Sequence, residues 1–201
     1  MKGLNSKRKV NFIDILLDKI GSEYEPEQVP IFVEPYSKPN NCFLNVEEKV
    51  KRDGGNVHYG WTIHKSEILY EGERHAVWES PDGDLIDITP NESSSNQRMF
   101  VSDNNFIFDG QLVDNIRVNI TDNPLVDDFI LLCEKTEKLY TYGKRVDDEQ
   151  MSVPLPALEV INHFQQLKSL LLDYIYILEE DPIRIAFVGL KLHIEIAMDK
   201  I

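Results

Sequence analysis

The spacing of apolar residues predicts helices at the start of the chain and throughout its last third. Residues 10–22 place apolar side chains at close to helical spacing. The same period recurs in residues 123–143 and, rich in Leu and Ile, in residues 156–179. A last apolar segment, residues 183–199, follows an Asp-Pro break and is also expected to be helical.

One further helix is expected early in the chain, after the turn-like sequence "SKPNN". Asn40 or Asn41 supplies its N-cap, and Gly54 marks its end. Cys42 then lies in the first turn. The apolar stripe of this helix consists of Phe43, Val46 and Val50.

Between these helices the pattern changes to alternation, which predicts strands. Residues 56–89 contain four short candidates, "VHYGWTI", "EILYE", "RHAVWES" and "DLIDIT". We also expect a short strand in "VPIFVEP", and short strands or extended segments in "MFVSD" and "NFIFDG". The predicted fold is α+β, with an antiparallel sheet packed on the Cys-bearing helix in residues 1–120. Residues 121–201 form a helical region that packs on this core.

Composition narrows the class of protein. Of 201 residues, 42% are hydrophobic, which is enough for a sizeable core, and the net charge is −14. That charge argues against nucleic acid or an anionic membrane as the partner, because phosphates bind Lys and Arg. No apolar run approaches a membrane span, and a cytoplasmic location is the default expectation. Two cysteines are too few for a disulfide framework.

Cys42 is the first candidate for chemistry. Backbone N–H groups and the helix dipole at a helix start favour an anion, so they favour the thiolate, which is the nucleophilic form of cysteine. The same N–H groups can stabilise the oxyanion of an acyl-transfer intermediate. The alternative is a buried cysteine that only packs, which is the commoner role of a lone cysteine in a helix.

The turn "SPDG" (residues 80–83) predicts a tight hairpin. With Ser80 paired to Asp84, Trp78 lies opposite Ile86. One face of the hairpin then carries His75, Val77, Asp87 and Thr89, and the other carries Ala76, Trp78, Ile86 and Ile88. A slip of one residue would send Asp87 to the other face.

This register places Asp87 diagonally next to His75, within side-chain reach. An acid between two isoleucines is costly to bury unless it has a partner, and His75 can be that partner. The pair fits a general base and the acid that orients it. A purely structural hydrogen bond at a sheet edge fits equally well.

With Cys42 added, the order Cys, His, Asp is that of a nucleophile, a base and an orienting acid. The pieces "NNCFLNV", "RHAVW" and "LIDITP" resemble the papain-like thiol superfamily, specifically its transglutaminase-like and protein-glutaminase-like branches. The run that contains them is also typical of small bacterial proteins. The resemblance covers residues 40–90 and implies that Cys42, His75 and Asp87 form a catalytic triad. The glutamine that papain-type peptidases carry upstream of the cysteine has no clear counterpart, and Asn40 or Asn41 is the candidate substitute in the oxyanion hole.

Other residues carry weaker signals. His58 and His64 match no compact metal-ligand spacing, so we expect no metal, and nothing indicates a cofactor. Trp61 is a candidate wall of a substrate cleft, although a strand aromatic is more often part of the core.

Two functions follow from the sequence. The first is a thiol-dependent acyl-transfer enzyme (amidase, glutamine deamidase, peptidase or transglutaminase) whose substrate is a protein or peptide amide. The second is a non-catalytic binding or regulatory domain on the same fold, with the C-terminal helices as the partner surface. The sequence leaves open whether the start of the Cys42 helix faces the His75 side or the Trp78 side of the hairpin.

Overall fold

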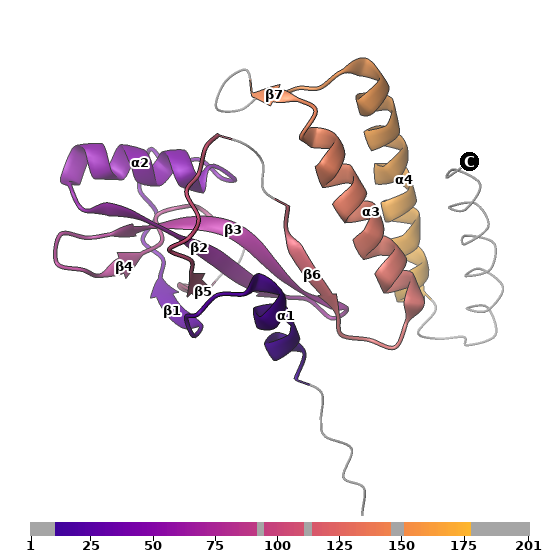
Figure 1. Ribbon diagram of the computed structural model, residues 1–201, viewed down its shortest axis with the longest axis horizontal. Helices are drawn as coiled ribbons and strands as arrows, with labels where there is room; N and C mark the ends of the chain where they lie inside the picture. The colour runs from indigo at the N-terminus through magenta and orange to yellow at the C-terminus, as the bar shows by residue number, and fades with distance from the viewer. Residues whose placement is uncertain (1–10, 92–94, 111–113, 146–150, 178–201) are drawn as a thin grey trace, which may run out of the picture.

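The computed structural model describes residues 11–91, 95–110, 114–145 and 151–177. They form an α+β fold in which helices cover an antiparallel sheet (Figure 1). The helices are α1 (Phe12–Ile20), α2 (Cys42–Asp53), α3 (Pro124–Tyr140) and α4 (Leu155–Ile177). The six strands of the sheet are β1 (Glu27–Pro30), β2 (Asn56–Lys65), β3 (Leu69–Glu79), β4 (Leu85–Ile86), β5 (Gln97–Ser102) and β6 (Ile116–Asn119). A separate two-stranded pair consists of β7 (Lys144–Arg145) and β8 (Met151–Ser152).

The strand order of the sheet is β1-β5-β2-β3-β4, and β6 pairs with the other end of β3. The long hairpin of β2 and β3 is its centre and pairs Asn56 with Glu79 at one end and Lys65 with Tyr70 at the other. On the far edge of β3, β6 pairs with residues 69–72 and β4 with residues 78–79. Among the described strands, the stretch of β3 between these two has no strand partner on that edge.

Hydrogen bonds join the first and last strands of this order. Just beyond β4, Asp87 forms a parallel bridge with Ile31, just beyond β1. The Asp87 N–H donates to the Pro30 carbonyl at 2.9 Å, and the Phe32 N–H donates to the Asp87 carbonyl at 2.8 Å. The sheet therefore closes on itself and has an inner and an outer face. The inner face carries a small core of Val29, Val77, Phe100 and Leu85.

Two helices pack on the outer face. Leu16 of α1 packs with Trp61, Ile63, Val101 and Val118. Val46 of α2 packs with Ala76 and Ile88, and Phe43, Val50, Trp78 and Ile86 join this cluster. The apolar sides of α1 and α2 therefore both pack on the outer face of this sheet, which explains their amphipathic patterns.

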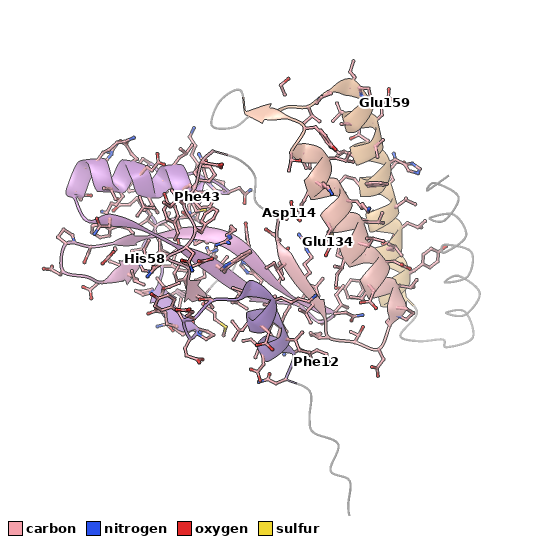
Figure 2. All side chains as sticks on the ribbon, viewed as in Figure 1. Phe12, Phe43, His58, Asp114, Glu134 and Glu159 are labelled. Carbon is pink, nitrogen blue, oxygen red and sulfur yellow. The ribbon has the colours of Figure 1, made fainter. Side chains whose placement is uncertain are left out.

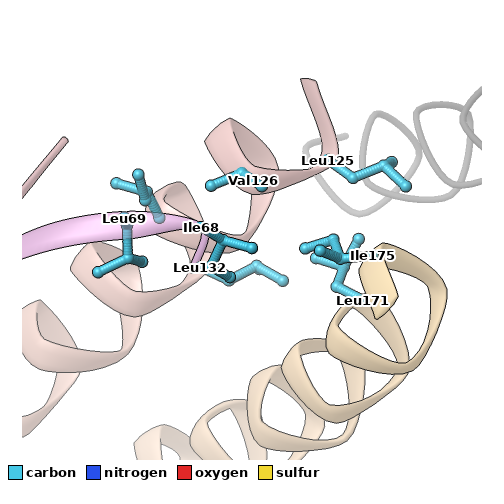
Figure 3. Packing of buried hydrophobic residues seen from close by; sticks show 8 residues of the cluster. Ile68, Leu69, Leu125, Val126, Leu132, Leu171 and Ile175 are labelled. Carbon is cyan, nitrogen blue, oxygen red and sulfur yellow. The ribbon is translucent and has the colours of Figure 1, made fainter. Parts of the chain in front are cut away.

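The C-terminal helices pack against the end of the sheet (Figures 1 and 3). Ile68 and Leu69, at the start of β3, enter a cluster with side chains of α3 and α4, which include Leu125, Val126, Leu132, Leu171 and Ile175. Asn123 caps α3 by accepting a hydrogen bond from the Leu125 N–H at 3.0 Å. Helices α3 and α4 therefore share a hydrophobic cluster with the sheet.

Most predicted elements are present with small shifts in their ends, but the separate strands predicted in "EILYE" and "RHAVWES" are one continuous strand, β3. The strand predicted in "VPIFVEP" lies earlier in the chain, because β1 (Glu27–Pro30) includes only the first two residues of this segment. Of the two alternatives for "NFIFDG", the strand is wrong, because residues 106–110 are not in a strand and instead contact α2 through their aromatic rings. Strand β6 was not predicted, because its four residues are too few to show a clear alternation of apolar and polar side chains. The predicted helix at 183–199 lies outside the described residues.

Within the described part of the chain, no helix has the length and apolar content that crossing a membrane requires.

Candidate active site

Cys42 is the first residue of α2, directly after the N-cap Asn41. Asn40 turns the chain into the helix with a positive φ of 58°, a conformation that asparagine adopts more readily than most residues. In the first turn of any helix the backbone N–H groups lack partners within the helix. Cys42 is therefore placed where a thiolate or an oxyanion would be stabilised, and its exposed fraction is 8%.

The side chain of Asn45 fixes the segment that leads into the helix. Its Oδ1 accepts a hydrogen bond from the Lys38 N–H at 3.0 Å, and its Nδ2 donates to the Lys38 carbonyl at 2.8 Å. The same Nδ2 donates to Oγ1 of Thr89 at 3.2 Å. Asn45 thereby ties together the approach to Cys42, the first turns of α2 and the chain just after Asp87.

The hairpin that carries His75 and Asp87 has the predicted register. The Ser80 N–H donates to the Asp84 carbonyl at 2.9 Å, and Trp78 lies opposite Ile86. Alternation therefore puts His75 and Asp87 on the inner face. Gly60 of β2 lies directly opposite His75. A Cβ at Gly60 would lie 2.4 Å from Cζ of Phe100, so the glycine leaves room for the Phe100 ring beside His75.

Asp87 is completely buried, and both of its carboxylate oxygens are engaged. Oδ1 accepts a hydrogen bond from the Thr89 N–H at 2.9 Å, and Oδ2 lies 3.1 Å from Nε2 of His75. Nε of Arg98 is 2.5 Å from the same Oδ2. Burial raises the pKa of Asp87, but His75, Arg98 and the Thr89 N–H outweigh it and lower the pKa, so the carboxyl stays ionised.

His75 completes the set by contacting both Asp87 and Cys42. Its ring hydrogen-bonds with the Cys42 side chain. Because Nε2 is engaged with Asp87, Nδ1 is the nitrogen available to Cys42. Burial alone would lower the pKa of His75, but the charge of a Cys42 thiolate, together with the Asp87 carboxylate, raises it to about 9. With a pKa of about 9, the His75 ring carries a proton at neutral pH.

Helix α2 contacts both sides of the hairpin, the Trp78 side and the His75 side. The body of α2 covers the Trp78 side of the hairpin through Val46 and Phe43. The first residue of α2 nevertheless contacts His75, on the opposite face. On the edge of β3 away from β2, β4 and β6 pair with its two ends. His75 lies between these pairings, where no described strand pairs with that edge. The helix start therefore meets the inner face at this gap.

Aromatic rings surround the residue that follows Cys42. Phe43, labelled in Figure 2 where α2 meets the sheet, stacks on Phe108 with ring centroids 4.1 Å apart. Tyr59 lies 6.1 Å from Phe43 and packs edge-on against Phe106. These rings form an apolar wall beside the start of α2, built partly by the segment that the sequence predicted as a strand or an extended segment.

Three other residues were predicted to belong to the site: Asn40, Asn41 and Trp61. Asn41 is buried next to Cys42, whereas Asn40 is exposed. Trp61 is 3% exposed and packs on the outer face with Leu16 of α1, which favours the core role over that of a cleft wall. In the described parts of the chain, no cluster of three or more His, Cys, Asp or Glu residues could hold a metal ion.

Sequence reasoning missed Arg98. It lies on β5, two residues before Phe100, and is 9% exposed. The signal was present in the alternation of "QRMFVS", which gives Arg98 and Phe100 the same face. An arginine at an inward position and an aspartate at an inward position each need a counter-charge, and the closed sheet brings the two together.

Comparison with known proteins gave no assignment: no family model, no curated protein and no solved structure matches this chain.

Proposed function

We propose that this protein is a cysteine-dependent acyl-transfer enzyme that acts on amide bonds through a thioester on Cys42, and that its core is papain-like, of the transglutaminase-like branch. The observation that carries the proposal is the hydrogen-bonded chain from Cys42 through His75 to Asp87. Its members come from a helix start, from β3 and from the chain just after β4, and they meet in the order nucleophile, base, orienting acid.

The chemical steps follow from this order. The Cys42 thiolate attacks the amide carbonyl carbon, and the N–H groups of the first turn of α2 bind the oxyanion. The C–N bond breaks, and His75 gives its proton to the departing nitrogen, which leaves as ammonia or an amine. A thioester remains on Cys42. Water or an amine attacks the thioester and loses a proton to His75, and the acid or the new amide leaves as the thiolate and imidazolium re-form.

The test is to trap the thioester. The purified protein is incubated with a library of peptides and with hydroxylamine, which intercepts acyl-enzymes as hydroxamates, and the acid-quenched protein is weighed by mass spectrometry. The proposal predicts an acyl adduct on Cys42 and peptide hydroxamates. Both disappear in Cys42→Ala and in His75→Ala. Cys133→Ala, which removes the other buried cysteine, is the matched control and keeps both.

The second candidate is a non-catalytic binding domain on the same fold. What favours it is the burial of the site, since Cys42 is 8% and His75 4% exposed. A binding domain predicts no adduct with any peptide, and the same thioester experiment therefore separates the two functions.

A further inference from the structure

The closed sheet brings a fourth charged side chain, Arg98, to the site. Arg98 lies opposite Val29 on one side of β1, and Asp87 bridges Ile31 on the other side, two residues further along. Val29 and Ile31 share a face, so Arg98 and Asp87 flank the end of β1 as diagonal neighbours on the inner face. This is why Nε of Arg98 reaches to within 2.5 Å of Oδ2 of Asp87.

We propose that Arg98 is a positioning residue of the Cys42–His75–Asp87 set, which holds Asp87 as a carboxylate and so keeps His75 aimed at Cys42. The inference rests on the proposed function for its meaning in catalysis. Whether or not the protein is an enzyme, the contact of Arg98 with Asp87 affects the reactivity of the Cys42 thiol.

A count of charges supports this role. A thiolate on Cys42, an imidazolium on His75 and a carboxylate on Asp87 sum to −1 in a buried space. Neutral forms of Cys42 and His75 beside the carboxylate also sum to −1. With the guanidinium of Arg98 both states sum to zero, so the proton can move between Cys42 and His75 without leaving a net buried charge, which is costly.

Arg98 is held chiefly by this ion pair. Its side chain is buried, and its Nη2 has no hydrogen-bond partner in the parts of the chain that the structure describes. Glu73 of β3 is a further charged group that interacts with His75 and Arg98, and His64 of β2 pairs with Glu73. Both are roughly half exposed, so solvent screens them more than it screens Asp87.

The test measures the rate at which iodoacetamide alkylates Cys42 across about pH 4–9, with the label mapped by peptide. In Arg98→Met, Asp87 loses its nearest cation and binds a proton at higher pH. The acid limb of the profile then moves up by about one to two pH units. The plateau near pH 8 stays within twofold of the wild-type rate. Arg98→Lys keeps a cation on a side chain of similar length and moves the limb less than Arg98→Met does.

The matched control is Arg117→Met. Arg117 is another strand arginine that is equally buried and paired with acids, Glu71 and Glu137, but it has no contact with Asp87. An unchanged acid limb in folded Arg98→Met, or an equal shift in Arg117→Met, overturns the proposal. If Arg98→Met does not fold, Arg98→Lys against Arg117→Lys makes the same comparison, and equal profiles in these two overturn it.

This experiment needs no substrate, so its outcome is separate from that of the thioester test. A shifted limb without any acyl adduct would leave Arg98 as the group that positions Asp87 and would contradict the proposed enzyme activity alone.

Discussion

Nε2 of His75 lies 3.1 Å from Oδ2 of Asp87, twelve residues further along the chain. This contact depends on the hairpin turn at residues 80–83, because a slip of one residue would turn Asp87 to the outer face and would turn Ile86 and Ile88 to the inner face. The backbone of Asp87 also forms hydrogen bonds with Pro30, at the end of β1, and with Phe32, just beyond it. The position of Asp87 is therefore fixed both by the hairpin and by the neighbouring end of β1.

The first prediction concerns the protonation of His75. With a pKa of about 9, above the ordinary 6.5, its ring stays protonated through neutral pH and loses the proton only as the pH rises through about 9. In Cys42→Ala, burial still lowers the pKa and one of the two negative partners is gone, so the titration moves down by at least about one pH unit. NMR of the imidazole carbons measures it. Cys133→Ala is the control, and a His75 ring that titrates near 6.5 in the wild type would contradict the prediction.

The ion pair of Asp87 and Arg98 predicts a strong coupling in stability. Asp87→Ala leaves the guanidinium buried without its counter-charge and lowers the free energy of unfolding by about 3–5 kcal/mol. Replacing both residues, with Arg98→Met as the second change, costs less than the sum of the two single changes. Urea denaturation of the wild type and the three variants measures the coupling. Additive losses would mean that the two side chains do not depend on each other.

A methyl group at Gly60 tests the packing behind His75. The new Cβ would lie 2.2 Å from the Val101 carbonyl oxygen and 2.4 Å from the Phe100 ring, so Gly60→Ala forces apart the backbone of β2 and β5. We expect a loss of about 1–3 kcal/mol in the free energy of unfolding. Gly72→Ala on β3 is the matched control, because its Cβ meets the end of the Ile20 side chain at 3.0 Å and the Trp61 ring at an ordinary contact distance of 3.6 Å, and it meets no backbone atom. An equal loss in both variants would argue against a special constraint at Gly60.

The hydrogen bonds from the Asn45 side chain to Lys38 hold the segment that leads to Cys42, and we call them the Asn45 clamp. We expect this segment to become more mobile when the clamp is removed. Asn45→Ala removes the hydrogen bonds of Asn45 to the Lys38 N–H and carbonyl and costs about 1–3 kcal/mol in stability. Hydrogen exchange at the amides of residues 36–42 becomes faster. Asn104→Ala, which removes an exposed hydrogen bond to Tyr24, is the control and leaves both measurements nearly unchanged. Unaltered exchange in Asn45→Ala would contradict the role of the clamp.

The helices and the hairpin could be predicted from the sequence because their signals are local. Helical periodicity fixed α1 to within two residues, and the "SPDG" turn fixed the register that brings Asp87 to His75. Arg98 and the closure of the sheet could not be predicted in this way. Both depend on the pairing of the chain beyond β1 with the chain beyond β4, and alternation within one strand carries no information about which distant strand lies beside it.

The sequence also could not predict that α2 contacts both faces of the sheet, because this too depends on how distant strands pair. Its apolar stripe predicted that the helix covers a sheet, and Val46 does so. Contact between Cys42 and His75 on the other face requires the gap on the edge of β3 between β4 and β6, and β6 was not predicted at all.

The measurement that tests the central claim most directly is the alkylation of Cys42 in the native protein at about pH 6. An ordinary free thiol, with a pKa of about 8.5, is almost entirely protonated there and reacts slowly. If His75 holds Cys42 as a thiolate, Cys42 is labelled at pH 6 nearly as fast as at pH 8, and His75→Ala slows the labelling at pH 6 by about tenfold or more. Cys133, whose pKa burial raises, stays unlabelled in the same sample. A Cys42 that resists labelling until the protein unfolds, or that reacts equally with and without His75, would contradict the nucleophile–base pair.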